Sequence, residues 1–300
     1  MIVNIMKKKL IIFFIICGVI IFFYKFFYFN NNSKYINFSN NKNCIKSLNK
    51  EIKPTSNPDY SFFVAGHVYG SPYANNPGIY PKFYKKLLDD RIKFEFGIFA
   101  GDITKEGDRE SWIVFDSQIR NLDYQIFIAP GNHDIGSTRL NKKRVEFKKK
   151  FGKLYQSFIF KNDLFIILNP YDNQWSIKGP QLEFLEKKLK KNYQLVDNIF
   201  IITHPVIYFN DNFNIKMNNF DGAGDNTNFW NEIYVLFKKY KNNYYVVAGD
   251  VGAFANGFEL FCEKFEETVF LATGMGGGER DNYLIFRKFK NKIFIVPEVF

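Results

Sequence analysis

The chain has 300 residues, of which 46% are hydrophobic, and its 41 Lys and Arg against 30 Asp and Glu give a net charge of +11. This hydrophobic content excludes a disordered chain, and the length suits one large domain or two small ones. Three cysteines exclude a disulfide-dense scaffold and a Cys-rich zinc module, and three histidines leave room for one site if they converge.

An uninterrupted apolar run over residues 10–24 (LIIFFIICGVIIFFY) follows three lysines near the N-terminus. Lys25 interrupts it before residues 26–29 (FFYF), but a long lysine side chain can reach the membrane interface, so the stretch has the ~20 residues that a span needs. No A-x-A pattern of a cleaved signal peptide follows. We expect residues 1–29 to be a signal anchor, a transmembrane helix, with a cleaved signal peptide as the alternative.

The lysines before the apolar run favour a cytoplasmic N-terminus, which places the following domain on the outer side of the membrane. A cleaved signal would instead give a secreted protein. Residues 1–29 carry four lysines and no acidic residue, which leaves +7 of the +11 charge for the rest. Such a mildly basic domain suits an acidic substrate or an anionic membrane surface. Because no recognisable nucleic-acid motif occurs, we expect no nucleic-acid partner.

Residues 30–58 are polar, rich in Asn and Lys and without sustained periodicity, and we expect them to be a linker. Cys44 in this segment and Cys262 could form a disulfide in an oxidising compartment, although nothing in the sequence sets their distance. From residue 59 to residue 300, short apolar runs alternate with amphipathic segments. This alternation predicts a single α/β domain with a strand-rich C-terminal part.

The apolar runs predict strands over residues 61–65, 94–100, 125–129, 157–160, 164–168, 198–203 and 244–248. Amphipathic periodicity predicts helices over residues 81–91, 110–121, 144–151, 181–191 and 229–240. Residues 258–299 are strand-rich and contain a Gly-rich break at 274–278, which could border a site or form an ordinary turn.

Glycine and polar residues follow five of these strands, and all three histidines are among them. The five groups are Gly66-His67, Gly101-Asp102, Gly131-Asn132-His133-Asp134, Thr203-His204 and Gly249-Asp250. Open α/β sheets bind ligands outside the carboxyl ends of their strands, so these side chains are candidates for one site. Asp, Asn and His together suit a hard to borderline ion such as Mn, Fe, Zn or Mg. Tyr69 and Tyr73, which follow the first group, could shape its pocket.

The motifs GDITKEG at 101–107 and GNHD at 131–134, followed by the strand-end His204, resemble those of the calcineurin-like metallophosphoesterase family. Residues 181–185 (QLEFL) also resemble the Gln-x-x-Trp-Leu helix common in that family. The resemblance implies a two-sheet α/β sandwich of the metallophosphoesterase type. The apolar run adds one N-terminal transmembrane helix before it. It also implies a metal-dependent phosphoesterase, hydrolysing a phosphomonoester or phosphodiester with a metal-activated water.

The resemblance also implies metal ligands, position by position. Asp102 would bridge two metal ions, His67 would bind the first ion, and Asn132 and His204 would bind the second. His133 would be the general acid for the leaving group. A further residue, Asp134, would orient the His133 ring by a hydrogen bond.

Two family motifs are altered in this chain. D-x-H reads Ala65-Gly66-His67, and G-H-x-H reads Gly249-Asp250-Val251-Gly252. The missing Asp and second His both serve the first ion in the family pattern, whereas Asp250 can replace the first His at the second ion. We therefore expect one firmly bound ion rather than two. The added carboxylate favours Mn, Fe or Mg, with Zn possible.

The expected substrate is a phosphorylated small molecule, or one linked to a lipid or polysaccharide. The alternative is a catalytically reduced metallophosphoesterase-like protein that binds a phosphorylated envelope ligand or partner. The altered motifs favour this alternative, while the retained His133 and Asp134 favour an active hydrolase.

Overall fold

The computed structural model describes residues 38–50, 52, 57–89, 93–136, 141–208, 227–252 and 260–300. All of them belong to one compact unit, residues 37–300. The signal anchor expected over residues 1–29 therefore lies outside the described residues. Among the helices that are described, none has the length and apolar character needed to cross a membrane.

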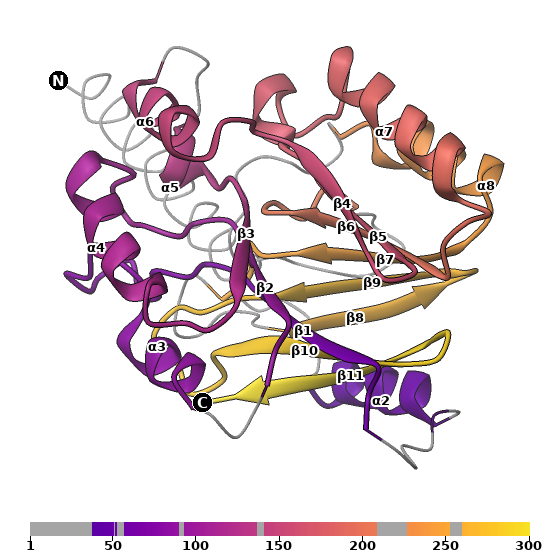
Figure 1. The fold of residues 1–300 in the computed structure, drawn as a ribbon, viewed down its shortest axis with the longest axis horizontal. Helices are drawn as coiled ribbons and strands as arrows, with labels where there is room; N and C mark the ends of the chain where they lie inside the picture. The colour runs from indigo at the N-terminus through magenta and orange to yellow at the C-terminus, as the bar shows by residue number, and fades with distance from the viewer. Residues whose placement is uncertain are drawn as a thin grey trace, which may run out of the picture. The chain divides into compact units, whose positions relative to one another are not determined.

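Two β-sheets organise the described part of the chain (Figure 1). The first contains, in spatial order, β11 (Lys292–Val299), β10 (Asn282–Phe289), β1 (Tyr60–Ala65), β2 (Phe96–Ala100) and β3 (Gln125–Ala129). The second contains β4 (Gln156–Phe160), β5 (Asp163–Ile167), β6 (Asn198–Thr203), β7 (Asn243–Ala248), β9 (Thr268–Thr273) and β8 (Leu260–Phe265). Because β1 to β3 are mutually parallel, as are β5, β6, β7 and β9, the carboxyl ends of each set share one sheet edge.

Phenylalanine side chains pack the two sheets against each other. Phe62 of β1 stacks on Phe286 within its own sheet and meets Phe165 and Phe200 of the other sheet edge-on, each at 5.1 Å between ring centroids. All four side chains are fully buried. Full burial of one such side chain contributes about 1.5–3 kcal/mol, so this contact stabilises the sandwich strongly.

Helices follow most strands and have recognisable starts. They are α3 (Pro81–Leu87), α4 (Arg109–Ile119), α5 (Asn132–Ile135), α6 (Lys142–Phe151), α7 (Pro180–Asn192) and a π-helical turn (Phe229–Ile233) that continues into α8 (Tyr234–Lys239). Proline begins α3 and α7, and Asp108 caps α4 by accepting the Ser111 N–H at 2.8 Å. Phe83 of α3 and Phe115 of α4 pack in one core cluster with Phe63 and Phe99 of the first sheet.

The two-sheet α/β architecture agrees with the sequence prediction, and the seven individually predicted strands end within two residues of the observed ones. Helix α3 ends at Leu87 rather than at residue 91, and the four-residue helix α5 was not predicted. Four strands account for the strand-rich C-terminal part.

The largest departure from the prediction is helix α2 (Phe38–Asn49), which lies within the segment expected to be a linker. Its Ile45 is buried in the inter-sheet core, and the Asn49 side chain exchanges two hydrogen bonds with the backbone of Ile295, at 2.7 and 3.0 Å. Cys44 forms a disulfide with Cys262 of β8. The linker interpretation is wrong for residues 38–49 because tertiary contacts stabilise a helix that has few apolar residues. The other domain boundaries stay predictions.

Candidate active site

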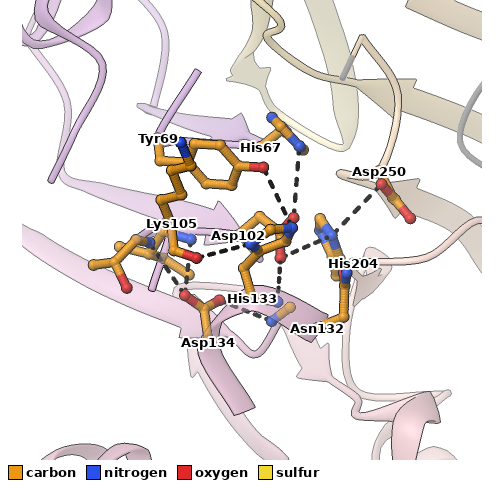
Figure 2. Close-up of polar contacts among 12 residues, drawn as sticks. His67, Tyr69, Asp102, Lys105, Asn132, His133, Asp134, His204 and Asp250 are labelled. Carbon is orange, nitrogen blue, oxygen red and sulfur yellow. Dashed lines mark hydrogen bonds and ion pairs between the residues drawn. The ribbon is translucent and has the colours of Figure 1, made fainter. Parts of the chain in front are cut away.

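Strand ends from both sheets bring the predicted polar residues together (Figure 2). His67, Asp102 and Asn132 follow strands of the first sheet, and His204 and Asp250 follow β6 and β7 of the second. Glycine permits this approach at Gly101, whose φ is +85° and where a Cβ would lie 2.3 Å from His204 Cγ.

Asp102 lies at the centre of the cluster and is fully buried. Its Oδ1 accepts the His133 N–H at 3.0 Å and lies 3.3 Å from His204 Nε2. Its Oδ2 lies 3.6 Å from His67 Nε2 and has no hydrogen-bond partner. Burial alone would raise the pKa of Asp102, but His204, His133 and His67 hold it well below its usual range, so the group is a carboxylate.

His67 and His204 face opposite oxygens of this carboxylate and differ in charge. Burial lowers the pKa of His67 to about 4, so that ring is neutral. Burial would also lower the pKa of His204, but Asp102 and Asp250 raise it to about 10. The two carboxylates thus favour positive charge at His204 Nε2, from a proton or from a bound cation.

His133 sits on α5, is partly buried, and lies between Lys105 and Tyr69. Its Nδ1 lies 2.7 Å from the Lys105 carbonyl oxygen, and its Nε2 lies 3.4 Å from the Tyr69 hydroxyl. Since a carbonyl only accepts hydrogen bonds, Nδ1 carries a proton. The neighbouring Asn132 accepts a hydrogen bond from the Tyr171 hydroxyl at 3.1 Å.

Asp134 is buried and holds backbone rather than the His133 ring. Its Oδ1 accepts the N–H groups of Ile103 and Thr104 at 3.0 and 3.2 Å, and its Oδ2 accepts the Gly131 N–H at 2.9 Å. Burial and the charge of Asp102 raise its pKa to about 7. The predicted hydrogen bond from Asp134 to the His133 ring is therefore wrong. Consecutive residues on a helical turn point in different directions, and the Lys105 carbonyl orients the ring instead.

The motif comparison did not find several groups that shape the site. The Lys105 carbonyl is backbone and has no sequence signature, and Tyr171 is one of 18 tyrosines. Asp281 accepts the N–H groups of residues 276, 277 and 278 at 2.8, 3.0 and 3.2 Å, which fixes the Gly-rich loop. The position of Asp281 just after the glycines at 276–278 was a sequence signal that could have predicted these hydrogen bonds.

The donor set at His204 fits a single divalent cation. Its Nε2 lies 3.3 Å from Asp102 Oδ1 and 3.6 Å from Asp250 Oδ1, and two ligands of one ion at about 2.1 Å lie about 3–4 Å apart. Both His204 Nε2 and Asp102 Oδ2 are buried without hydrogen-bond partners. Among the described residues, no group of three or more His, Cys, Asp or Glu is placed so that it could hold a metal ion, so the fit rests on these two pairs of donors alone.

Comparisons with known proteins agree with this arrangement. A family model described as calcineurin-like phosphoesterase matches residues 67–224, more than half of the chain. The fold is similar to purple acid phosphatase PPD1 from yellow lupin (Lupinus luteus) seeds, with a TM-score of 0.59, 15% identity, and coverage of 80% of this chain and 51% of that one.

A putative 5'-nucleotidase from Staphylococcus aureus has a TM-score of 0.46 and 13% identity, over 80% of this chain and 52% of that one. The chain thus spans about half the length of these two structures. No curated protein matches the sequence.

Proposed function

Since the chain belongs to the calcineurin-like phosphoesterase family, we propose that it hydrolyses phosphoesters at the cluster around Asp102. The observation that carries this proposal is the convergence of the His67 and His204 rings on the two oxygens of one buried carboxylate, which also accepts the backbone N–H of His133, the third histidine of the chain. Histidines that only filled the core would not be expected to gather at one charged partner.

Membership of the family implies a divalent metal cofactor. We assign one ion to Asp102, Asn132, His204 and Asp250, and we expect Mn, Fe or Mg in preference to Zn. When bound, such an ion supplies electrostatic stabilisation of the phosphoryl oxygens. The chain's own contribution is to hold His204 in place, since its Nδ1 lies 2.7 Å from the Ala100 carbonyl oxygen.

We assign the role of general acid to His133. Its Nδ1–H bond to the Lys105 carbonyl fixes the ring, so Nε2 is the nitrogen that can give a proton to the leaving oxygen. His133 is only partly buried, whereas His67 and His204 are fully buried, so its ring is the one that a substrate oxygen can reach.

The proposed substrate is a phosphorylated small molecule or a lipid- or polysaccharide-linked phosphoester, and no nucleic acid is expected. We also propose that residues 1–29 anchor the chain in a membrane with the catalytic domain outside, or that signal cleavage releases it. The Cys44–Cys262 disulfide supports an extracytoplasmic location because disulfides persist in oxidising compartments.

A second candidate function is binding of a phosphorylated envelope ligand without turnover. The residues favouring it are Ala65, which offers no metal ligand at the end of β1, and Gly252, which has no side chain. These changes remove ligands from the first-ion half only, so the catalytic proposal stays the stronger one.

The test is turnover by the full chain in detergent, with p-nitrophenyl phosphate and bis-p-nitrophenyl phosphate, each with and without Mn²⁺. Metal-dependent hydrolysis of either compound supports the catalytic proposal. A metal-dependent rise in melting temperature without turnover would favour the binding protein, and activity that survived Asn132→Ala combined with His133→Ala would contradict the proposed mechanism.

A further inference from the structure

The half of the site around His67 lacks two ligands of the family pattern, and position 252 has little room for one of them. Ala65 is fully buried and contributes only a methyl group. Gly252 has a φ of +84°, and a Cβ there would lie 3.0 Å from the Gly274 carbonyl carbon and 3.1 Å from Met275 N. A side chain at position 252 would therefore need both a strained backbone and a shift of the Gly-rich loop.

Tyr69 lies in this half and is held from several sides. Its exposed fraction is 1%. The centroid of its ring lies 4.4 Å from that of His67 and 5.0 Å from that of His133. Its backbone N–H donates to the backbone carbonyl of Asp102 at 3.1 Å. The Asn76 side chain donates to its carbonyl at 3.1 Å. Figure 2 shows a dashed line from its hydroxyl to the His133 ring.

The hydroxyl of Tyr69 lies next to the proposed general acid. It is 3.4 Å from Nε2 of His133, the nitrogen assigned to give a proton to the leaving oxygen. A phosphoester whose leaving oxygen meets this nitrogen would also bring a phosphoryl oxygen within reach of the Tyr69 hydroxyl.

We propose that the Tyr69 hydroxyl donates a hydrogen bond to the substrate's phosphoryl oxygen on the His67 side, and that this half of the site holds no second ion. The inference rests on the proposed function and names the group that contacts the phosphate where metal ligands are missing. Tyr69 is then a catalytic residue that acts by direct contact, since a fixed donor stabilises charge that develops on a phosphoryl oxygen.

The test compares Tyr69→Phe with Tyr73→Phe in the full chain. Tyr73 follows in the same loop but is 83% exposed, so its variant is the matched control. Isothermal titration with inorganic phosphate in Mn²⁺ should show about 10- to 100-fold weaker binding for Tyr69→Phe, because hydrogen bonds to charged groups have that strength. Tyr73→Phe should bind like the unmutated chain, and kcat/KM for p-nitrophenyl phosphate should fall only in Tyr69→Phe.

Elemental analysis should count one bound ion in the unmutated chain and in Tyr69→Phe. Unchanged phosphate affinity in Tyr69→Phe would overturn the contact, and a second ion that is lost on His67→Ala would overturn the assignment of this half. The ion count can be made on the unmutated chain. It therefore tests whether this half of the site holds a second ion even if Tyr69→Phe does not fold. If no phosphoester is hydrolysed but Tyr69→Phe still weakens phosphate binding, the proposed function fails while the Tyr69 contact stands.

Discussion

At the scale of single residues, the backbone of the site is as constrained as its side chains. His67 and Asp102 have positive φ values of 51° and 53°, which non-glycine residues rarely adopt. Each such conformation costs about 1 kcal/mol or more. The surrounding contacts must offset that cost. In this conformation the two side chains meet beyond the strand ends, with His67 Nε2 3.6 Å from Asp102 Oδ2.

Gly101→Ala should destabilise the domain more than Gly152→Ala does. Both glycines have positive φ, at +85° and +77°, but a Cβ at 101 meets the His204 ring while a Cβ at 152 meets nothing within 4 Å. Urea unfolding should give a loss of about 1 kcal/mol for Gly152→Ala and at least about 2 kcal/mol more for Gly101→Ala. Equal losses would show that the close approach at His204 is not needed.

His133→Ala should lower kcat by about 10²- to 10⁴-fold for an alkyl phosphate, since the leaving alkoxide would lack its proton donor. The loss should be much smaller for p-nitrophenyl phosphate, because p-nitrophenolate leaves without a proton. Steady-state kinetics with both substrates measure this contrast. Losses of the same size for both would argue that His133 has another role.

At the scale of secondary-structure elements, the strands could be predicted from the sequence, whereas contacts made by backbone groups and by helix α2 could not. The runs behind β3 and β6 gave the observed bounds because each contains consecutive apolar residues; β6 is buried throughout, whereas β3 is buried only at its carboxyl end. The strand-end positions of Asp102 and His204 followed from those bounds. The ring partner of His133 could not be predicted, because it is a backbone carbonyl that only the fold brings near. Helix α2 was missed because few of its residues are apolar and its stability comes from β8 and β11.

Removing the disulfide by Cys44→Ser with Cys262→Ser should lower the free energy of unfolding by about 2–5 kcal/mol. The effect should be concentrated in α2, whose amide protons should exchange faster while those of β6 change little. Hydrogen exchange followed by mass spectrometry measures this. Reductant should destabilise the unmutated chain and leave the double variant unaffected, and protection in α2 that survived the change would contradict this role.

At the scale of the whole molecule, the site depends on both sheets equally. The first sheet supplies Asp102 and His133, and the second supplies His204 and Asp250. Any shift of one sheet against the other would therefore separate the carboxylate from His204. The aromatic contacts around Phe62 oppose such a shift, because interlocked rings cannot slide without leaving voids.

Deleting residues 1–37 should release the protein from membranes while leaving turnover of p-nitrophenyl phosphate within a few-fold of the full chain. The deleted segment contains the apolar run, and the described helices and strands begin after it. Fractionation by ultracentrifugation with and without detergent measures the distribution. A full-length chain that stays in the supernatant without detergent would contradict the anchor.

The Cys44–Cys262 bond also determines what a protease can release. For a chain anchored through its N-terminal residues, as we propose, a cut between α2 and β1 would break the polypeptide without freeing the hydrolase. The anchor-bearing fragment would end after α2, and the disulfide would still join it to β8. Release of the domain after such a cut would also require reduction of the disulfide. The Cys44–Cys262 bond would therefore keep a cleaved domain attached to the membrane.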